Sequence, residues 1–151
     1  MSLKTRLEED LKDAVRAGDT LRRSVIRLVR SEIRNEEIAA QKDLDDDGVL
    51  QVLSRQVKQR RDSIDAFAQV GRQDLVDQER AEMAVLLEYL PEQLSRDEIA
   101  GLVTQAIEET GAGGPADMGK VMGRVMPQLK GRAQGADVSA VVMELLKAMT
   151  G

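Results

Sequence analysis

The chain contains no cysteine and no histidine among its 151 residues. Without cysteine it can form no disulfide bond and offers no thiolate nucleophile, and without either residue it lacks the usual nitrogen and sulfur ligands of a zinc site. The lack of histidine also removes the side chain that most often acts as a general acid or base near neutral pH. Thiol enzymes, histidine-dependent hydrolases and ordinary zinc enzymes are therefore excluded.

Aromatic residues are nearly absent as well, with one Phe, one Tyr and no Trp. A hydrophobic core must then be built from aliphatic side chains and methionine, whereas β-strands would be expected to carry more aromatic and β-branched residues. The overall composition, 42% hydrophobic and 32% charged, is ordinary for a globular protein. We therefore predict an all-α fold.

Long hydrophobic runs are also missing. No apolar stretch approaches the roughly 18 residues of a membrane-spanning helix, and the N-terminus, MSLKTRLEED, carries acids where a secretory signal needs an apolar core. From these features we predict a cytoplasmic protein with no membrane partner. The net charge of −5 argues against a general nucleic-acid coat protein, so any nucleic-acid contact must be local.

Apolar residues recur at helical spacing along nearly the whole chain. The pattern predicts one helix that stops at Gly18, a second that starts near Asp19, a third that ends at Gly71, and a fourth that runs from about Asp74 to Pro91. Three shorter helices are predicted near 96–110, 116–129 and 138–149, the first of them started by the capping box of Ser95 and Glu98. We predict a four-helix N-terminal domain, residues 1–91, followed by a small three-helix tail domain, residues 92–151.

The second predicted helix carries a strip of four arginines at helical spacing, Arg23, Arg27, Arg30 and Arg34. Two interpretations stay open. The strip is either an exposed face whose charges pair with acids of a neighbouring helix (Glu8, Glu9, Asp10 or Asp13), or it binds an anion or docks a protein.

The segment DMGKVMGRVMPQLKGRAQGADV, residues 117–138, places two glycines inside an amphipathic helix. A glycine in a helix interior lowers the stability of the helix by roughly 1 kcal/mol relative to alanine, so a pair at i, i+4 indicates a structural or functional role. The glycines fall between the apolar face and a cationic stripe, and residues 118–132 contain four cations and no acid. The bare backbone either admits a nucleic-acid strand or allows close packing of a neighbouring helix. The candidate nucleic-acid-binding residues are Gly119, Lys120, Gly123, Arg124, Lys130 and Arg132.

Several of these motifs, YLPEQLSRDEI, GAGGPADMGKVMGRVMPQLKGRA and the upstream KQRRDSIDAF with GRQDL, resemble the YqeY family of small bacterial proteins over nearly the whole chain. The C-terminal block also resembles the tail domain of the B subunit of the glutamine-dependent aminoacyl-tRNA amidotransferases. The resemblance implies an all-helical protein whose tail contributes to recognising the body of a tRNA. The tail motif falls on Asp117, Gly119, Lys120, Val121, Met122, Gly123, Arg124, Gly131, Arg132 and Ala133.

The same resemblance implies an association with carbon–nitrogen ligase chemistry in which glutamine is the amido-N-donor. The residues themselves provide no P-loop, dinucleotide fingerprint or nucleophile elbow, so we predict no catalytic residue, metal site or cofactor within this chain. We expect a small cytoplasmic accessory protein that binds tRNA-like RNA through the C-terminal patch. The alternatives are carbon–nitrogen ligase activity in partnership with other amidotransferase subunits, or a protein–protein adaptor that binds no nucleic acid.

Overall fold

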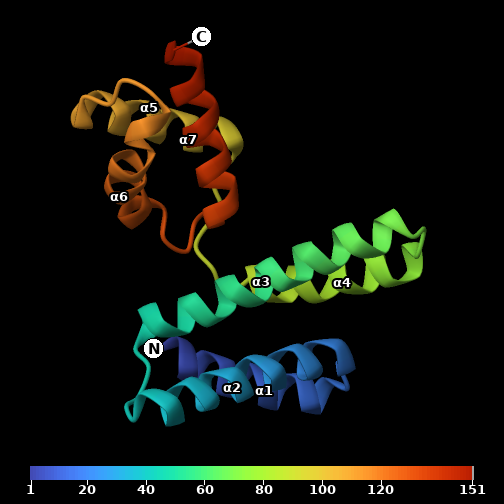
Figure 1. The fold of residues 1–151 in the computed structure, drawn as a ribbon. Coiled ribbons are helices and arrows are strands. Elements are labelled where there is room, and N and C mark those ends of the chain that lie inside the picture. Colours follow the sequence, from blue (N-terminus) through green and yellow to red (C-terminus); the bar gives the residue numbers. More distant parts are fainter. Residues whose placement is uncertain (151) are drawn as a thin grey trace. The chain divides into compact units, whose positions relative to one another are not determined.

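The computed structural model describes residues 1–150, and all the regular secondary structure in that range is helical (Figure 1). The predicted all-α class is confirmed. The chain divides into two compact units, Met1–Pro91 and Glu92 onward. Within the described range, no helix is both long enough and apolar enough to cross a membrane.

The first unit consists of two helical hairpins, visible as side-by-side pairs in Figure 1. Its helices are α1 (Leu3–Ala17), α2 (Thr20–Ala40), α3 (Asp46–Gln69) and α4 (Gln73–Leu87). Gly18 ends α1 and Gly71 follows α3, each with a positive φ, 69° and 72°, that residues with a side chain rarely adopt. Asp19 caps the N-terminus of α2, and Asp45 caps the N-terminus of α3.

The core of the first unit is aliphatic, and its largest fully buried side chains include Leu7, Ile26, Leu53 and Leu86. Helical periodicity also predicts buried positions for Val15, Leu21 and Leu28, but these side chains lie at the surface, 48%, 37% and 42% exposed. The periodicity gives the centre of a buried face correctly, whereas its edges depend on which neighbouring helix covers them.

The predicted fourth helix ends earlier than expected, at Leu87. The N–H groups of Glu88, Tyr89 and Leu90 bond to carbonyls three residues back, because Pro91 disfavours helical geometry in the residue before it. The tighter turn buries Tyr89, whose hydroxyl donates a hydrogen bond to Asp10 of α1. Burial, followed by this hydrogen bond, raises the pKa of Tyr89, so its phenol stays neutral near pH 7.

A group of charged side chains lies between α3 and α4 with little exposure. Arg60 Nε is 3.1 Å from a carboxylate oxygen of Glu82, and Arg60 Nη1 is 3.6 Å from one of Glu79. Burial, then repulsion by Glu82, raise the pKa of Glu79, and the attraction of Arg60 opposes that shift. The pair of acids therefore shares one cation.

The second unit contains α5 (Arg96–Thr110), the short 3-10 helix η1 (Pro115–Asp117), α6 (Met118–Leu129) and α7 (Gly135–Thr150). The predicted capping box is present: the Glu98 N–H donates to Ser95 Oγ at 3.1 Å, and the Ser95 N–H donates to the Glu98 carboxylate at 3.0 Å. The last helix begins three residues earlier than the predicted 138. A separate aliphatic core fills this unit; it includes Val103, Val121, Leu129, Val142 and Leu146.

Candidate functional site

Helix α6 has one buried face and one face that is exposed to solvent. Val121, Val125 and Leu129 are fully buried in the core of the second unit, and the three methionines of α6 are half-buried against it. The predicted site residues Gly119, Lys120, Gly123 and Arg124 all lie on the exposed side of the helix. The amphipathic pattern thus places them together at the surface, as the sequence predicted.

The two glycines do not serve packing within the second unit. A Cβ atom added to Gly119 or Gly123 would meet no side chain and no other helix of that unit within 4 Å. Within this unit, therefore, no neighbouring helix makes use of the bare backbone. One turn after Gly123, Pro127 has no N–H, so the Gly123 carbonyl lacks its usual i+4 donor. The open side of α6 thus presents bare backbone and one carbonyl without that donor.

The four cations near this backbone differ in how far they are neutralised. Arg124 pairs with Glu109 of α5, with Nε 2.7 Å from the carboxylate oxygen. Arg132 lies near Glu98, whose pKa is lowered mainly by hydrogen bonds with Ser95 and further by the Arg132 charge. Within residues 1–150, neither Lys120 nor Lys130 forms an ion pair.

Glu109 is the residue near this surface that the sequence reasoning missed. Its second carboxylate oxygen accepts a hydrogen bond from Gln105, so it is held in place on α5. The acid-free stretch 118–132 gave no sign of it, because the two partners are fifteen residues apart and meet only when α5 and α6 pack together. No local motif in the sequence encodes that contact.

The loop that carries Lys130 and Arg132 is held by the segment that enters α5. The Leu94 N–H donates to the Arg132 carbonyl at 2.9 Å, and the Gln93 side-chain amide donates to the Gly131 carbonyl at 2.8 Å. Gly131 has a φ of 78°, a conformation that suits glycine. The two cations of this loop are therefore placed by main-chain contacts.

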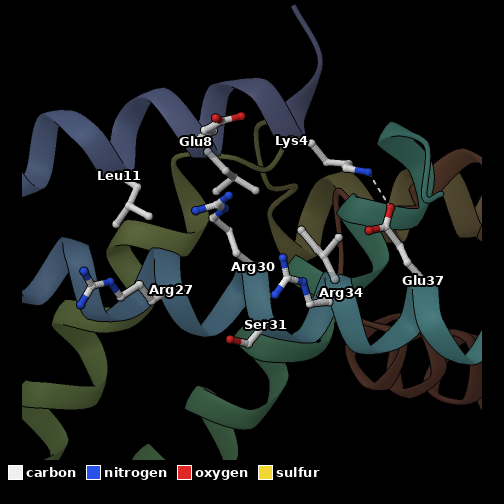
Figure 2. A pocket seen from close by; sticks show the side chains of 10 residues that line it. Lys4, Glu8, Leu11, Arg27, Arg30, Ser31, Arg34 and Glu37 are labelled. Atoms are coloured by element: carbon white, nitrogen blue, oxygen red, sulfur yellow. Dashed lines mark hydrogen bonds and ion pairs between the residues drawn. The ribbon is translucent and has the colours of Figure 1, made fainter.

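A second surface feature is a groove between α1 and α2 in the first unit (Figure 2). Its larger cavity, about 590 Å³, is lined by Lys4, Leu7, Glu8, Leu11, Arg27, Arg30, Ser31, Ile33, Arg34 and Glu37. At one end, Lys4 pairs with Glu37 at 2.5 Å, and Glu37 also accepts the Leu44 N–H at 2.8 Å. These two bonds fix Glu37, and its pKa is lowered mainly by Lys4.

The arginine strip does not pair as the first interpretation required. Glu8 lies 3.8 Å from Lys12 and Asp13 lies 3.5 Å from Arg16, whereas Asp10 accepts the hydrogen bond of Tyr89. In the part of the chain that the structure describes, none of the four arginines of the strip forms an ion pair. The interpretation of a strip neutralised by acids of α1 is therefore wrong, and three of the arginines line the groove.

The family model of the Yqey-like proteins matches residues 4–146. This chain belongs to the YqeY family. A relative from Pyrenophora tritici-repentis is 35% identical over 146 residues, covering 95% of this chain and 80% of the relative. Relatives from Lachancea thermotolerans and Kluyveromyces lactis are 44% and 37% identical over 85 and 124 residues. The matches cover 56% and 79% of this chain, and 46% and 66% of those two relatives.

All three relatives carry the name "Altered inheritance of mitochondria protein 41, mitochondrial". Their name points away from the cytoplasm and overturns the predicted cytoplasmic location. That prediction rested on the absence of an apolar signal and of a membrane-spanning run, and neither feature separates the cytoplasm from the mitochondrial interior. Mitochondrial targeting uses amphipathic, arginine-rich segments and needs no apolar core.

The sequence predicted no metal site. Among residues 1–150, the structure gathers no group of three or more acidic side chains that could hold a metal ion. The two surfaces singled out by their geometry are the exposed side of α6 and the groove between α1 and α2.

Proposed function

We propose that this YqeY-family chain is a helical accessory protein whose second unit binds tRNA-like RNA through the exposed side of α6. The observation that carries the proposal is the open space beside Gly119 and Gly123, next to Lys120. Each glycine costs its helix roughly 1 kcal/mol relative to alanine, and no contact within the second unit makes use of it. Bare backbone beside an unpaired cation suits the close approach of an external phosphate backbone.

The chemistry of this surface matches RNA in two ways. The Lys120 ammonium can neutralise a phosphate, and the Gly123 carbonyl, which lacks its helical donor, can accept a hydrogen bond from a ribose 2′-hydroxyl. Base stacking is not available, because residues 92–151 contain no aromatic side chain. The surface would thus recognise the shape and backbone of a folded RNA, and the resemblance to the amidotransferase tail points to tRNA.

The charge of the second unit sets the strength of such binding. Residues 92–151 contain eight acidic and six basic side chains, a net charge of −2. Near the exposed side of α6, Lys120, Lys130 and Arg132 are the cations left to attract phosphate, since Arg124 is already paired with Glu109. With about three phosphates contacted, the affinity is expected to fall roughly tenfold to a hundredfold between 50 and 200 mM salt.

Charge reversal at Lys120 tests the proposal. We expect Lys120→Glu to weaken the binding of fluorescently labelled tRNA at least about tenfold at 50 mM NaCl, because a repelled phosphate replaces an attracted one. Fluorescence anisotropy with the full chain measures this. Lys147→Glu is the matched control: it makes the same charge change on α7 of the same unit, outside the α6 surface, and is expected to change the affinity less than twofold.

The proposal fails if tRNA does not bind the full chain at 50 mM NaCl. It also fails if Lys147→Glu weakens binding as much as Lys120→Glu, because the effect would then belong to the net charge of the unit. Arg124→Glu is less informative, since it would place two carboxylates opposite each other where Arg124 now meets Glu109.

A further inference from the structure

The groove between α1 and α2 continues beyond the cavity that holds the Lys4–Glu37 pair. A second cavity of about 400 Å³ adjoins it and shares Glu8, Leu11, Arg27 and Arg30 with it. Along α1 the lining extends from Lys4 to Arg16. At 1.5 Å per residue this is about 18 Å, or roughly three turns of a helix laid alongside.

The floor of the groove is apolar. Leu7 and Ile33 are buried at its base, Leu11 is half-buried, and Val15 is 48% exposed at the far end. Leu7, Leu11 and Val15 follow one another at the helical spacing of α1, so they form a strip along the groove. The exposed aliphatic carbon of this strip comes from Leu11 and Val15, which no element of the first unit covers fully.

The rim is cationic and lacks compensating acid. Six cations line the two cavities, Lys4, Lys12, Arg16, Arg27, Arg30 and Arg34, against two acids, Glu8 and Glu37. Both acids already face a lysine, since Glu8 lies near Lys12 and Glu37 pairs with Lys4. Figure 2 shows Arg27, Arg30 and Arg34 projecting from α2 beside the groove, with Leu11 pointing from α1 toward α2. On a chain of net charge −5, Arg27 and Arg30 are thus left for an external anion, and Arg34, whose charge also helps to lower the pKa of Glu37, lies beside them.

We propose that this groove docks an acidic amphipathic helix of a partner protein. The apolar side of that helix covers Leu11 and Val15 on the floor, and its carboxylates meet Arg27, Arg30 and Arg34. Amphipathic helices commonly bind in this way, with anchors at i, i+3 or i+4, and i+7. The three arginines have that spacing, and guanidinium groups bind carboxylates through two parallel hydrogen bonds.

A protein helix fits these observations better than RNA does. A phosphate backbone gains nothing from the aliphatic floor, and the lining contains no aromatic side chain on which a base could stack. This proposal concerns the first unit and does not depend on RNA binding by α6.

A designed peptide tests the proposal on the full chain. The probe is a fluorescein-labelled helix of about 16 residues with leucines at i, i+3 or i+4, and i+7 spacing and glutamates along one edge. We expect saturable binding by fluorescence anisotropy at 100 mM NaCl. Arg27→Glu with Arg30→Glu should weaken it at least about tenfold, because carboxylates would then face carboxylates. The methyl NMR signals of Leu11 and Val15 should shift when the peptide binds.

Arg23→Glu is the matched control, since Arg23 belongs to the same strip but does not line either cavity. It should change the peptide affinity less than about twofold. Circular dichroism checks the fold of the reversed variant, and Arg27→Gln with Arg30→Gln should still weaken binding if the reversed variant does not fold.

Several outcomes would overturn the proposal. No binding of the peptide is one, and equal binding of a peptide with the same composition in scrambled order is another, because the apolar floor would then play no part. If the arginine substitutions weaken tRNA binding and leave the peptide unaffected, the occupant is an RNA. If they instead abolish self-association in sedimentation experiments, the occupant is a second copy of the chain.

Discussion

Glu79 shows how a single residue can limit the stability of this fold. Its side chain is only 16% exposed, and it shares Arg60 with Glu82. Burial raises the pKa of Glu79 above its ordinary value, which means that folding favours the protonated form. Such a group contributes stability that is fully present below its unfolded pKa and is lost as the pH rises through the folded value.

We therefore expect Glu79→Gln to raise the melting temperature at pH 8 relative to the unmodified chain, and to raise it less at pH 4, because the substitution removes a charge that the fold disfavours. Thermal melts followed by circular dichroism between pH 4 and pH 8 measure the difference. Asp74→Asn provides the opposite sign in melts extended to about pH 2, since a hydrogen bond from Arg72 lowers the pKa of Asp74 below its ordinary 3.8. The contribution of Asp74 is present above that ordinary value and is lost only as the pH falls through the lowered one. If Glu79→Gln instead lowers the melting temperature at pH 8 relative to the unmodified chain, the attraction between Arg60 and the Glu79 carboxylate outweighs the cost of burying that charge.

At this scale the sequence predicts local contacts and misses distant ones. The bonds between Ser95 and Glu98 follow from their spacing of three residues, and the turn at Gly18 follows from the conformational freedom of glycine. The pairing of Arg124 with Glu109 could not be predicted in the same way, because it depends on how two helices pack. The acids expected beside the arginine strip were misassigned for the same reason.

Among the helices, α6 departs furthest from what helix propensity alone would favour. It contains two exposed glycines and an internal proline, yet it buries three aliphatic residues completely. Tertiary packing of that apolar face outweighs the unfavourable propensity of its open side.

We expect Gly119→Ala and Gly123→Ala each to stabilise the protein by up to about 1 kcal/mol, because alanine is the better helix former and its methyl group meets open space. The same substitutions should weaken tRNA binding, since the added methyl group lies where the phosphate backbone would approach. Thermal denaturation and fluorescence anisotropy on the same samples separate the two effects.

Gly101→Ala on α5 is the control for that experiment, since Gly101 is also inside a helix, exposed and without a neighbour within 4 Å. It should stabilise the protein in the same way and leave tRNA binding unchanged. If all three variants gain stability and keep full affinity, the bare backbone of α6 has no part in RNA binding.

On the scale of the whole molecule, the chain contains two separate aliphatic cores. One is built from α1 to α4 and the segment up to Leu90, the other from α5 to α7 with Leu94 and Ala112 at their ends. The end of a helix before Pro91 and the start of α5 at its capping box could be read from the sequence. The groove could not, because its floor and rim come from two helices whose facing sides the sequence does not specify.

We expect residues 92–151, expressed alone, to fold into a helical unit with a cooperative thermal transition, because their core is complete without the first unit. A domain of about 60 residues buries only some 60% of its unfolded surface, so its stability should be modest. Circular dichroism measures both the helicity and the melting curve, with residues 1–91 as the companion fragment. A coil spectrum for residues 92–151 would show that the second core depends on the first unit.

The distribution of aromatic residues has a consequence for optical experiments. Phe67 and Tyr89 both belong to the first unit, and Tyr89 is buried against Asp10. Near-ultraviolet absorbance and intrinsic emission therefore originate almost entirely from one tyrosine, and residues 92–151 contribute no chromophore to them. A change in tyrosine emission during a titration or a melt reports on the surroundings of α1 and Tyr89, while events on α6 stay optically silent unless a label is introduced there.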